Sequence, residues 1–352
     1  MEGAGVIDEL LRKEGFWSMP GPRNDIVLSS RIRLARNMDI CFSAEQDSGL
    51  GIIRQSIDRF LNESVYGGKC SLIDLRELDY FEKRLLRERN VISLEMEESD
   101  KSYIIVNPED DFVILVNDDD TFRIQVIRPG LQFLETYGIA DEVDNELNRI
   151  IPYAFSDELG YLTTSPANLG TGLKASCLVH LPVSAFMNRI KELTSDFSKN
   201  GVNISATVSK NRAPGDIYQM SNRATLGVSE VDIIGHMDCM VNRVIDIEDS
   251  ERDRLISESR LDLEDRVWRS YGILLFSRRI SYLEALEHLS NIRLGIVLAI
   301  IRDKEINLIN ELMVSIQWSH LQRIYDRFFL NSAECDEYRA EHMKYRLRDQ
   351  KE

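Results

Sequence analysis

Three consecutive aspartates, Asp118 to Asp120, lie within "LVNDDDTFRIQVI", between two segments in which apolar and polar residues alternate. Arg123 follows four residues after the middle aspartate. Acids in this position suit three roles: solvated residues of a hairpin turn, ligands of a metal ion, or carboxylates of an active site. The local sequence does not choose between these roles, so the choice depends on what else the chain brings to the same place.

A second segment with chemical potential is "NDIVLSSRIRLARN". If it is a strand, a period of two puts Ser29, Arg31 and Arg33 on one face. Two neighbouring arginines repel each other unless an anion lies between them, and the guanidinium fork suits phosphate oxygens. The alternative is a polar outer face whose arginines pair with surface acids. Arg123 and Lys174 lie on two further predicted strands, so four cations on three strands could form a polyphosphate pocket.

The composition fits a globular chain, with 43% hydrophobic and 29% charged residues among 352. A formal net charge of -16 argues against a protein that mainly coats nucleic acid or anionic lipid. The sequence has no run of about 18 uncharged apolar residues, and its start, "MEGAGVIDELLRKEG", lacks a signal-peptide pattern. We therefore expect a cytoplasmic protein without a nucleic-acid or membrane partner.

Metal and disulfide chemistry receive little support. The five cysteines are odd in number and widely scattered, which fits a reducing compartment. His236 and Cys239 have a ligand-like spacing without a second pair, so we expect two buried side chains and no metal site. Neither GxxxxGK[ST] nor GxGxxG occurs, so a nucleotide would be held without a P-loop or a Rossmann turn.

The two halves of the chain differ in periodicity. "SYIIVN", "DFVILVN" and "TFRIQVIR" predict a β-meander, and "GLKASCLVHLP" and "GDIYQMSN" predict further strands. "VSAFMNRIKELTSDFSKNG" predicts a helix that ends at a glycine. Antiparallel hairpins interleaved with helices favour an α+β fold.

From about Ser229 onward, apolar residues at helical spacing predict a helical bundle. Ser281 and Glu284 have the spacing of a capping box before "ALEHLSNIRLGIVLAII". The charged tail "EYRAEHMKYRLRDQKE" predicts a frayed, solvated helix end.

Four segments carry a resemblance: "SSRIRLARN", "VNDDDTFRI", "GYLTTSPANLGTGLKAS" and "IYQMSNRATLGVSE". In sequence and order they resemble the ATP:guanidino phosphotransferases, the phosphagen kinase superfamily. The short N-terminus lacks the helical domain of creatine and arginine kinases. The helical extension with "CDEYRA" is similar to that of the bacterial protein-arginine kinases, which phosphorylate arginine side chains of proteins. The resemblance implies a mostly antiparallel, glutamine-synthetase-like catalytic domain at 1–245, with a short lead at 1–23, and a helical domain at 246–352.

The resemblance also implies the chemistry. Arginines would embrace the phosphates of ATP, with Mg²⁺ bridging the oxygens, while acids hold the substrate guanidinium and accept a proton. The catalytic acid is expected at Asp119, with Asp118 and Asp120 beside it. The expected nucleotide-binding residues are Ser29, Ser30, Arg31, Ile32, Arg33, Asn90, Arg123, Lys174, Ala175 and Ser176. The implied partners are proteins with exposed arginine, an activator protein, a protease-associated unfoldase and a second copy of the chain.

The chain departs from the family motifs where the chemistry would be. The family's Glu-Glu-Asp-His is Asp118–Thr121 here, so the catalytic glutamate becomes Asp119, one methylene shorter. Lys174 stands for a phosphate-binding arginine, Asn90 for a histidine and Ser165 for the reactive-site cysteine. Lysine keeps the charge but loses the bidentate fork.

Two further segments diverge. "NISATVSKNRAPGD" falls on the family's Arg-Gly-x-x-Gly-Glu-x-Ser-Glu, so Ile204 replaces a phosphate arginine and Ser209 a substrate-side glutamate, with Lys210 and Arg212 nearby. In "CDEYRA", Cys335 replaces the first arginine of a motif that binds phosphoarginine in protein-arginine kinases. Two hypotheses follow: an active protein-arginine kinase with a remodelled pocket, or a pseudokinase of the same fold that acts as a nucleotide-binding scaffold or adaptor.

Overall fold

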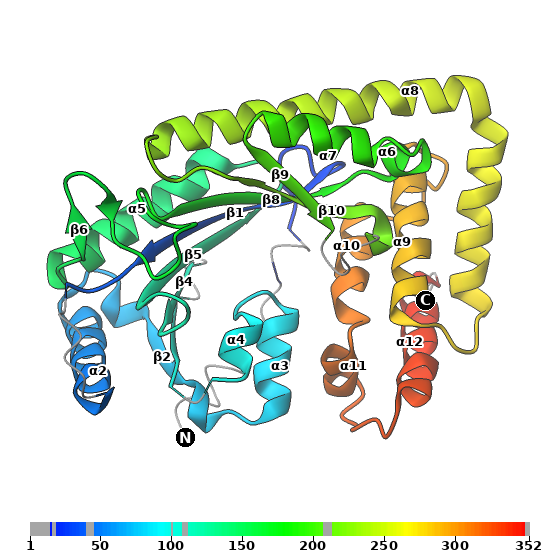
Figure 1. The fold of residues 1–352 in the computed structure, drawn as a ribbon. Helices are drawn as coiled ribbons and strands as arrows, with labels where there is room; N and C mark the ends of the chain where they lie inside the picture. The colour runs from blue at the N-terminus through cyan, green and yellow to red at the C-terminus, as the bar shows by residue number, and fades with distance from the viewer. Residues whose placement is uncertain are drawn as a thin grey trace. The chain divides into compact units, whose positions relative to one another are not determined.

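The computed structural model describes residues 15, 19–39, 46–99, 101–107, 112–206 and 213–348. Within them the chain forms two compact units, drawn in Figure 1. The first unit holds Ser30–Ser176 and Ser221–Asp238, and the second holds the remaining described residues. The chain passes between the units inside β1, β8, β10 and α8. No helix in the described ranges is long and apolar enough to span a membrane.

The strands form a large sheet in the order β2-β3-β4-β5-β1-β8-β10-β9. Strands β3, β4 and β5 pair antiparallel, with Ile105 opposite Ile114 and Ile114 opposite Ile124, so the predicted meander is confirmed. The predicted α+β fold is also confirmed. The bounds are β1 Val27–Arg36, β2 Ser71–Asp74, β3 Tyr103–Asn107, β4 Phe112–Val116, β5 Phe122–Pro129, β8 Leu173–His180, β9 Val202–Ala206 and β10 Ile217–Asn222, beside a small hairpin of β6 Phe155–Ser156 and β7 Gly160–Tyr161.

In the first unit, helices support the meander strands. Helix α5 packs against β5, and α2 packs against α5. One apolar cluster joins β2, β3 and β4 to α3 and α4, and it includes Leu85, Met96 and Ile104, all at most 1% exposed. Helix α3 begins with a complete capping box between Asp79 and Glu82. The bounds are α2 Gln46–Glu63, α3 Tyr80–Glu88, α4 Leu94–Glu97 and α5 Phe133–Ile150.

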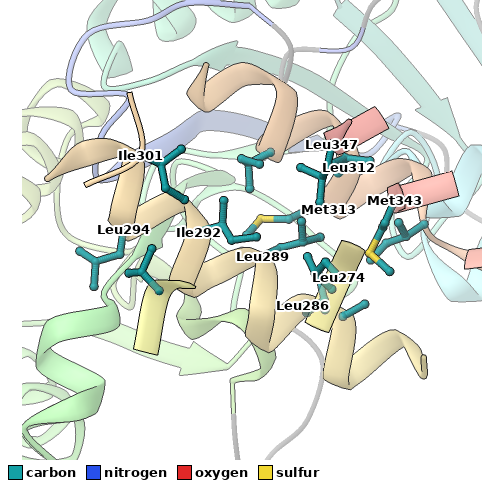
Figure 2. Packing of buried hydrophobic residues seen from close by; sticks show 14 of the residues in the cluster. Leu274, Leu286, Leu289, Ile292, Leu294, Ile301, Leu312, Met313, Met343 and Leu347 are labelled. Atoms are coloured by element: carbon teal, nitrogen blue, oxygen red, sulfur yellow. The ribbon is translucent and has the colours of Figure 1, made fainter. Parts of the chain in front are cut away.

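The second unit is mainly helical, as the periodicity predicts. Figure 2 shows Leu289 and Ile292 of α9 meeting Leu312 and Met313 of α10, within one buried cluster. Helix α9 begins at the predicted cap, where the Ser281 hydroxyl accepts from the backbone N–H of Glu284. The bounds are α6 Pro182–Phe186, α7 Ile190–Lys199, α8 Glu230–Phe276, α9 Tyr282–Val297, α10 Ile306–Ser315, α11 Trp318–Ile324 and α12 Ser332–Leu347.

Three sequence-based expectations need correction. The helix expected across 183–201 is two helices, because Asn188 adopts a left-handed φ of 57° between α6 and α7. Gly201, with a φ of 74°, does follow the second helix. His236 and Cys239 are exposed on α8, not buried, because the core face of that turn is occupied by Met237 and Met240.

The charged tail is packed as far as Leu347, so the expectation of a solvated helix end is wrong there. Ala340, Met343 and Leu347 are at most 2% exposed. Arg339 is also buried, and its guanidinium donates to the carbonyls of Ile316 at 2.8 Å and Ile280 at 3.0 Å. It also donates to Asp336 and lies 3.2 Å from the sulfur of Cys335. These bonds tie α12 to the segments before α9 and after α10. Residues 349–352 lie outside the described ranges.

Candidate active site

The four predicted cations converge within the first unit. Arg31 and Arg33 lie on β1, Arg123 lies on β5 and Lys174 lies on β8. Strands β5, β1 and β8 are neighbours in the sheet, which places these side chains across three adjacent strands. The alternate β1 side chain, Ile32, is fully buried in the core, as a period of two requires.

Burial and mutual repulsion lower the pKa values of Arg31, Arg33 and Lys174. Loss of hydration, together with the charge of Arg123, lowers the pKa of Arg31 to about 10. The pKa of Arg33 falls to about 9 for the same reason, with added repulsion from Arg31 and Arg123. Burial, followed by repulsion from Arg33 and Arg31, also lowers the pKa of Lys174. With pKa values of about 10 and 9, Arg31 and Arg33 remain protonated at neutral pH, so the site holds positive charge that an anion would stabilise.

Arg33 differs from a structural arginine three residues along the same strand. Arg36 is 2% exposed and pairs with Asp144 at 2.6 Å, while its guanidinium lies 3.6 Å from the ring centroid of Tyr161. In the described part of the chain, by contrast, the buried Nε of Arg33 has no hydrogen-bond partner. Buried polar atoms seldom lack a hydrogen bond, so the environment of Arg33 is typical of a residue that binds a ligand.

Hydrogen bonds orient Lys174 and Arg31. Lys174 Nζ donates to the backbone carbonyl of Asn222 at 2.6 Å. The Asn222 side-chain oxygen accepts from the N–H of Ala175 at 2.9 Å, so β10 fixes both residues. Arg31 Nε donates to the Ser176 hydroxyl at 3.3 Å. Asn222 was not among the predicted site residues, although it is the last residue of the "IYQMSN" segment.

The glycines before Lys174 let β8 approach β1 closely. Gly172 has a φ of 66°, a left-handed conformation that glycine adopts without strain. A Cβ at this position would lie 2.5 Å from the carbonyl oxygen of Ala35. The Gly172 carbonyl accepts from the N–H of Ala35 at 3.0 Å. The "GTGLK" segment therefore brings Lys174 alongside the β1 arginines.

The three aspartates have different environments. Asp118 is 1% exposed at its side chain, accepts from the Ser93 hydroxyl at 3.0 Å and forms a short ion pair with Arg123. Burial raises the pKa of Asp118, against the opposing charge of Arg123. Asp119 pairs with Arg123 Nη2 at 2.9 Å, but its side chain is 56% exposed. Asp119 is thus the acid of the three that a substrate can reach.

Asp120 is buried and serves the local structure. Its carboxylate accepts from Asn37 at 3.1 Å, from the N–H of Thr164 at 2.7 Å and from Asn168 at 3.2 Å. These contacts hold the segment around Ser165, the position of the family's reactive cysteine. Asp120 was predicted as a site residue only because it follows Asp119 in the sequence. Its contacts with Asn37 and Asn168 were not predicted.

The remaining predicted residues are buried or make contacts that hold the strands and turns of the site together. The Ser30 hydroxyl donates to the carbonyl of Gly130 and accepts from the N–H of Gln132, which ties β1 to the turn after β5. Ser29 and Ala175 are buried. Asn90 is exposed after α3 with a φ of 60°, and its carbonyl accepts from Gln125 at 2.9 Å.

The segment "NISATVSKNRAPGD" is described only in part. Ser209, Lys210 and Arg212 lie outside the described residues. Ile204, which stands for a phosphate arginine, is a 5% exposed core residue of β9. Among the described residues, no group of three or more metal-binding side chains occurs.

Comparisons with known proteins define the class of this fold and site. Residues 52–251 match the family model "ATP:guanido phosphotransferase, C-terminal catalytic domain". A solved structure of a lombricine kinase matches with a TM-score of 0.56 at 21% identity, covering 70% of this chain and 76% of that one. A duplicated taurocyamine kinase from Schistosoma mansoni matches with a TM-score of 0.57 at 21% identity, and the matched region spans 69% of this chain and 38% of that one. The chain belongs to the ATP:guanido phosphotransferase family.

Within that family, the whole chain is similar to one group. Residues 260–352 match the model "Protein-arginine kinase McsB C-terminal domain". A "Protein-arginine kinase" of Bacillus subtilis (strain 168) is 38% identical over 334 residues, which cover 93% of this chain and 91% of the relative. One of Symbiobacterium thermophilum is 36% identical and covers 96% of this chain and 97% of the relative. These matches place the chain with the protein-arginine kinases, as the motifs predict.

Proposed function

We propose that this protein transfers the γ-phosphoryl group of ATP to the guanidinium group of arginine side chains in proteins. The observation that carries the proposal is the buried Nε of Arg33, which has no hydrogen-bond partner among the described residues and lies within a group of four cations beside the exposed carboxylate of Asp119. Such a group favours a polyphosphate, and the carboxylate favours a guanidinium next to it. The names of the relatives give the same substrate class.

The residues divide into two roles. Arg31, Arg33 and Lys174 bind the phosphate oxygens and stabilise the charge that develops on the transferred group. Asp119 orients the substrate guanidinium. As a guanidinium nitrogen forms the bond to phosphorus, the bond from phosphorus to the ADP oxygen breaks, and Asp119 accepts the nitrogen's proton. Arg123 belongs to the same group of cations and also pairs with Asp118 and Asp119, so it links the two roles.

ATP and Mg²⁺ are the proposed cofactors. The four cations fit a polyphosphate, and the buried Nε of Arg33 has no hydrogen-bond partner among the residues that the structure describes. A magnesium ion that accompanies a nucleotide binds mainly through phosphate oxygens and water. Bound magnesium would neutralise phosphate charge. Asp119, with its exposed side chain, is the carboxylate available to it or to the substrate.

The pseudokinase alternative is less well supported. Lys174 retains the charge of the arginine that it replaces, and Asp119 retains a reachable carboxylate. The relatives that share 36–38% of the sequence over more than nine tenths of the chain have the names of kinases. A scaffold would keep the phosphate cations but would not need the exposed acid beside them.

The direct test is a transfer assay. The full chain, Mg²⁺, ATP labelled at the γ position and an arginine-rich unfolded protein are incubated together, with and without a candidate activator. We expect labelled phosphate that acid removes and base does not, which is the stability of a phosphorus–nitrogen bond. Nucleotide binding without any transfer, in either condition, would support the scaffold instead.

We further propose that the chain is a homodimer joined through its helical domain. On α8, Leu261, Trp268 and Phe276 are 78%, 50% and 73% exposed, and their spacings of seven and eight residues form one apolar stripe. A second copy would bury this stripe. We expect Trp268→Glu to raise the dimer dissociation constant at least about tenfold in sedimentation equilibrium. Leu134→Glu, at a 74% exposed apolar residue of α5, is the control that should leave the dimer intact.

The remaining proposals rest on the family. We propose cytoplasmic work in protein quality control, with an activator protein, a protease-associated unfoldase and arginine-bearing protein substrates as partners. We also propose the division at 245/246 between the catalytic and helical domains. It lies near the end of the first family match, at residue 251, and before the second, which starts at residue 260.

A further inference from the structure

A cavity of about 80 Å³ lies in the second unit, and none of the cations and acids described above lines it. Helices α6, α8 and α9 supply its walls. Its apolar wall is formed by Pro182, Leu255, Leu263 and Leu294, which are all buried. The half-exposed ring of Phe186 completes this wall. An apolar group of a few carbon atoms would fill such a space favourably.

The cavity exists because α8 is interrupted. At Ser259, which also borders the cavity, φ is -145° and ψ is 36°, so the helix changes direction there. In a regular helix, Leu255 and Leu263 would lie on one continuous face, because they are eight residues apart. The break instead leaves a hollow between them, with the exposed residues Asp262 and Arg266 at its edge.

The charged residues at this edge behave unlike their neighbours on α8. Three pairs of opposite charge at a spacing of four residues form ion pairs on this helix: Arg254–Glu258, Arg260–Glu264 and Asp265–Arg269. Asp262 and Arg266 have the same spacing, in the acid-first order that favours pairing. Within the described ranges these two residues form no ion pair, with each other or with any other residue.

Arg266 is instead held in place by two other contacts. Its Nε donates to the side-chain oxygen of Asn291 at 2.8 Å, and Asn291 in turn donates to the Ser270 hydroxyl at 2.9 Å. Its guanidinium carbon lies 5.1 Å from the ring centroid of Phe186. The cost of ordering this long side chain is thus already met, and its two terminal nitrogens stay available to a carboxylate.

We propose that this cavity binds a small free α-amino acid with an apolar side chain of about the size of leucine. The side chain fills the space between Leu255, Leu263 and Leu294. The carboxylate of the amino acid pairs with Arg266, and its ammonium group pairs with Asp262. An apolar pocket flanked by one fixed cation and one acid, which do not neutralise each other, matches this zwitterion in shape and charge.

The test uses the full chain and four small probes: L-leucine, glycine, leucinamide and 4-methylpentanoate. We expect L-leucine to bind with a dissociation constant on the order of 1 mM or tighter in calorimetry. At saturating concentration it should raise the melting temperature by about 2–4 °C. Glycine lacks the side chain, leucinamide the carboxylate and 4-methylpentanoate the ammonium group, so each should bind at least about tenfold more weakly.

Two variants and matched controls test the assignment of the charges. Arg266→Met and Asp262→Asn should each weaken leucine binding about tenfold or more, and both residues are exposed, so folding should be preserved. Arg269→Met and Asp265→Asn each remove one partner of the neighbouring Asp265–Arg269 ion pair, and should leave leucine binding unchanged. The proposal is overturned if leucine does not bind at about 20 mM, if glycine binds equally well, or if the control variants weaken binding as much. Equal binding of leucinamide or 4-methylpentanoate would equally overturn it.

Discussion

Arg33→Met is expected to abolish phosphoryl transfer while making the protein more stable to heat. The substitution keeps the apolar stem and removes a charge that burial and two neighbouring arginines destabilise, as its pKa of about 9 reflects. We expect kcat/KM to fall at least about 1000-fold, the range seen when an arginine that stabilises a transferred phosphoryl group is lost. We expect the melting temperature to rise by about 2–4 °C, because the buried Nε of Arg33 has no hydrogen-bond partner in the described ranges and removing this charge relieves an unfavourable interaction.

Three measurements test this expectation together: the transfer rate, the affinity for ATP and the melting temperature without nucleotide. Arg33→Lys keeps the charge but loses the fork, and should retain more activity than the methionine variant. Arg76→Met is the matched control in the same unit, because Arg76 is exposed and pairs with Asp74. If Arg33→Met instead lowers the melting temperature and leaves ATP affinity unchanged, Arg33 is a structural residue and the phosphate assignment fails.

Arg33→Met is expected to lower the transfer rate but to raise the melting temperature. These opposite effects explain why an unfavourable arrangement of charges persists. Arg36, on the same strand, has Asp144 and two tyrosine rings around it and contributes to the fold. Arg33 has no comparable partner in the described part of the chain. Proteins keep such groups where a ligand supplies the missing interaction, at the expense of stability without the ligand.

The sequence predicted the strands and the cations well because both follow from short-range patterns. A period of two in "SSRIRLAR" places Arg31 and Arg33 on one face and Ile32 in the core, and the structure confirms this arrangement. The meander followed from short β-branched segments separated by acidic turns. The family motifs then placed Arg123 and Lys174 with them, and the sheet order confirms that their strands are adjacent.

The polar contacts could not be predicted in the same way, because their partners are distant in the sequence. Asp120 looks like its two neighbours in the sequence, yet its partners Thr164 and Asn168 come from a segment more than 40 residues away. The burial of α12 was missed for a related reason. Its composition is charged, but Arg339 finds backbone carbonyls of Ile280 and Ile316 that no local pattern reveals.

These contacts separate the three aspartates into a substrate-facing acid and two supporting ones, which leads to the second large expected effect. Asp119→Asn should lower kcat about 100- to 1000-fold, the usual effect of removing a general base, while the affinity for ATP changes less than about threefold. The reason is exposure: Asp119 is 56% exposed and touches Arg123 through one oxygen, so its loss leaves the phosphate cations in place. Single-turnover transfer and nucleotide titration measure the two quantities separately.

Neighbouring variants sharpen this expectation. Asp118→Asn removes a buried partner of Arg123, so it should lower the melting temperature and weaken ATP binding, unlike Asp119→Asn. Asp157→Asn, at an exposed acid of the β6–β7 hairpin, should change neither. Asp119→Glu restores the longer acid of the family motif, and should keep kcat within about tenfold of the natural protein if the turn between β4 and β5 already brings the shorter side chain close enough. An unchanged kcat in Asp119→Asn would show that another group takes the proton. A large gain in Asp119→Glu would show instead that aspartate reaches its substrate poorly.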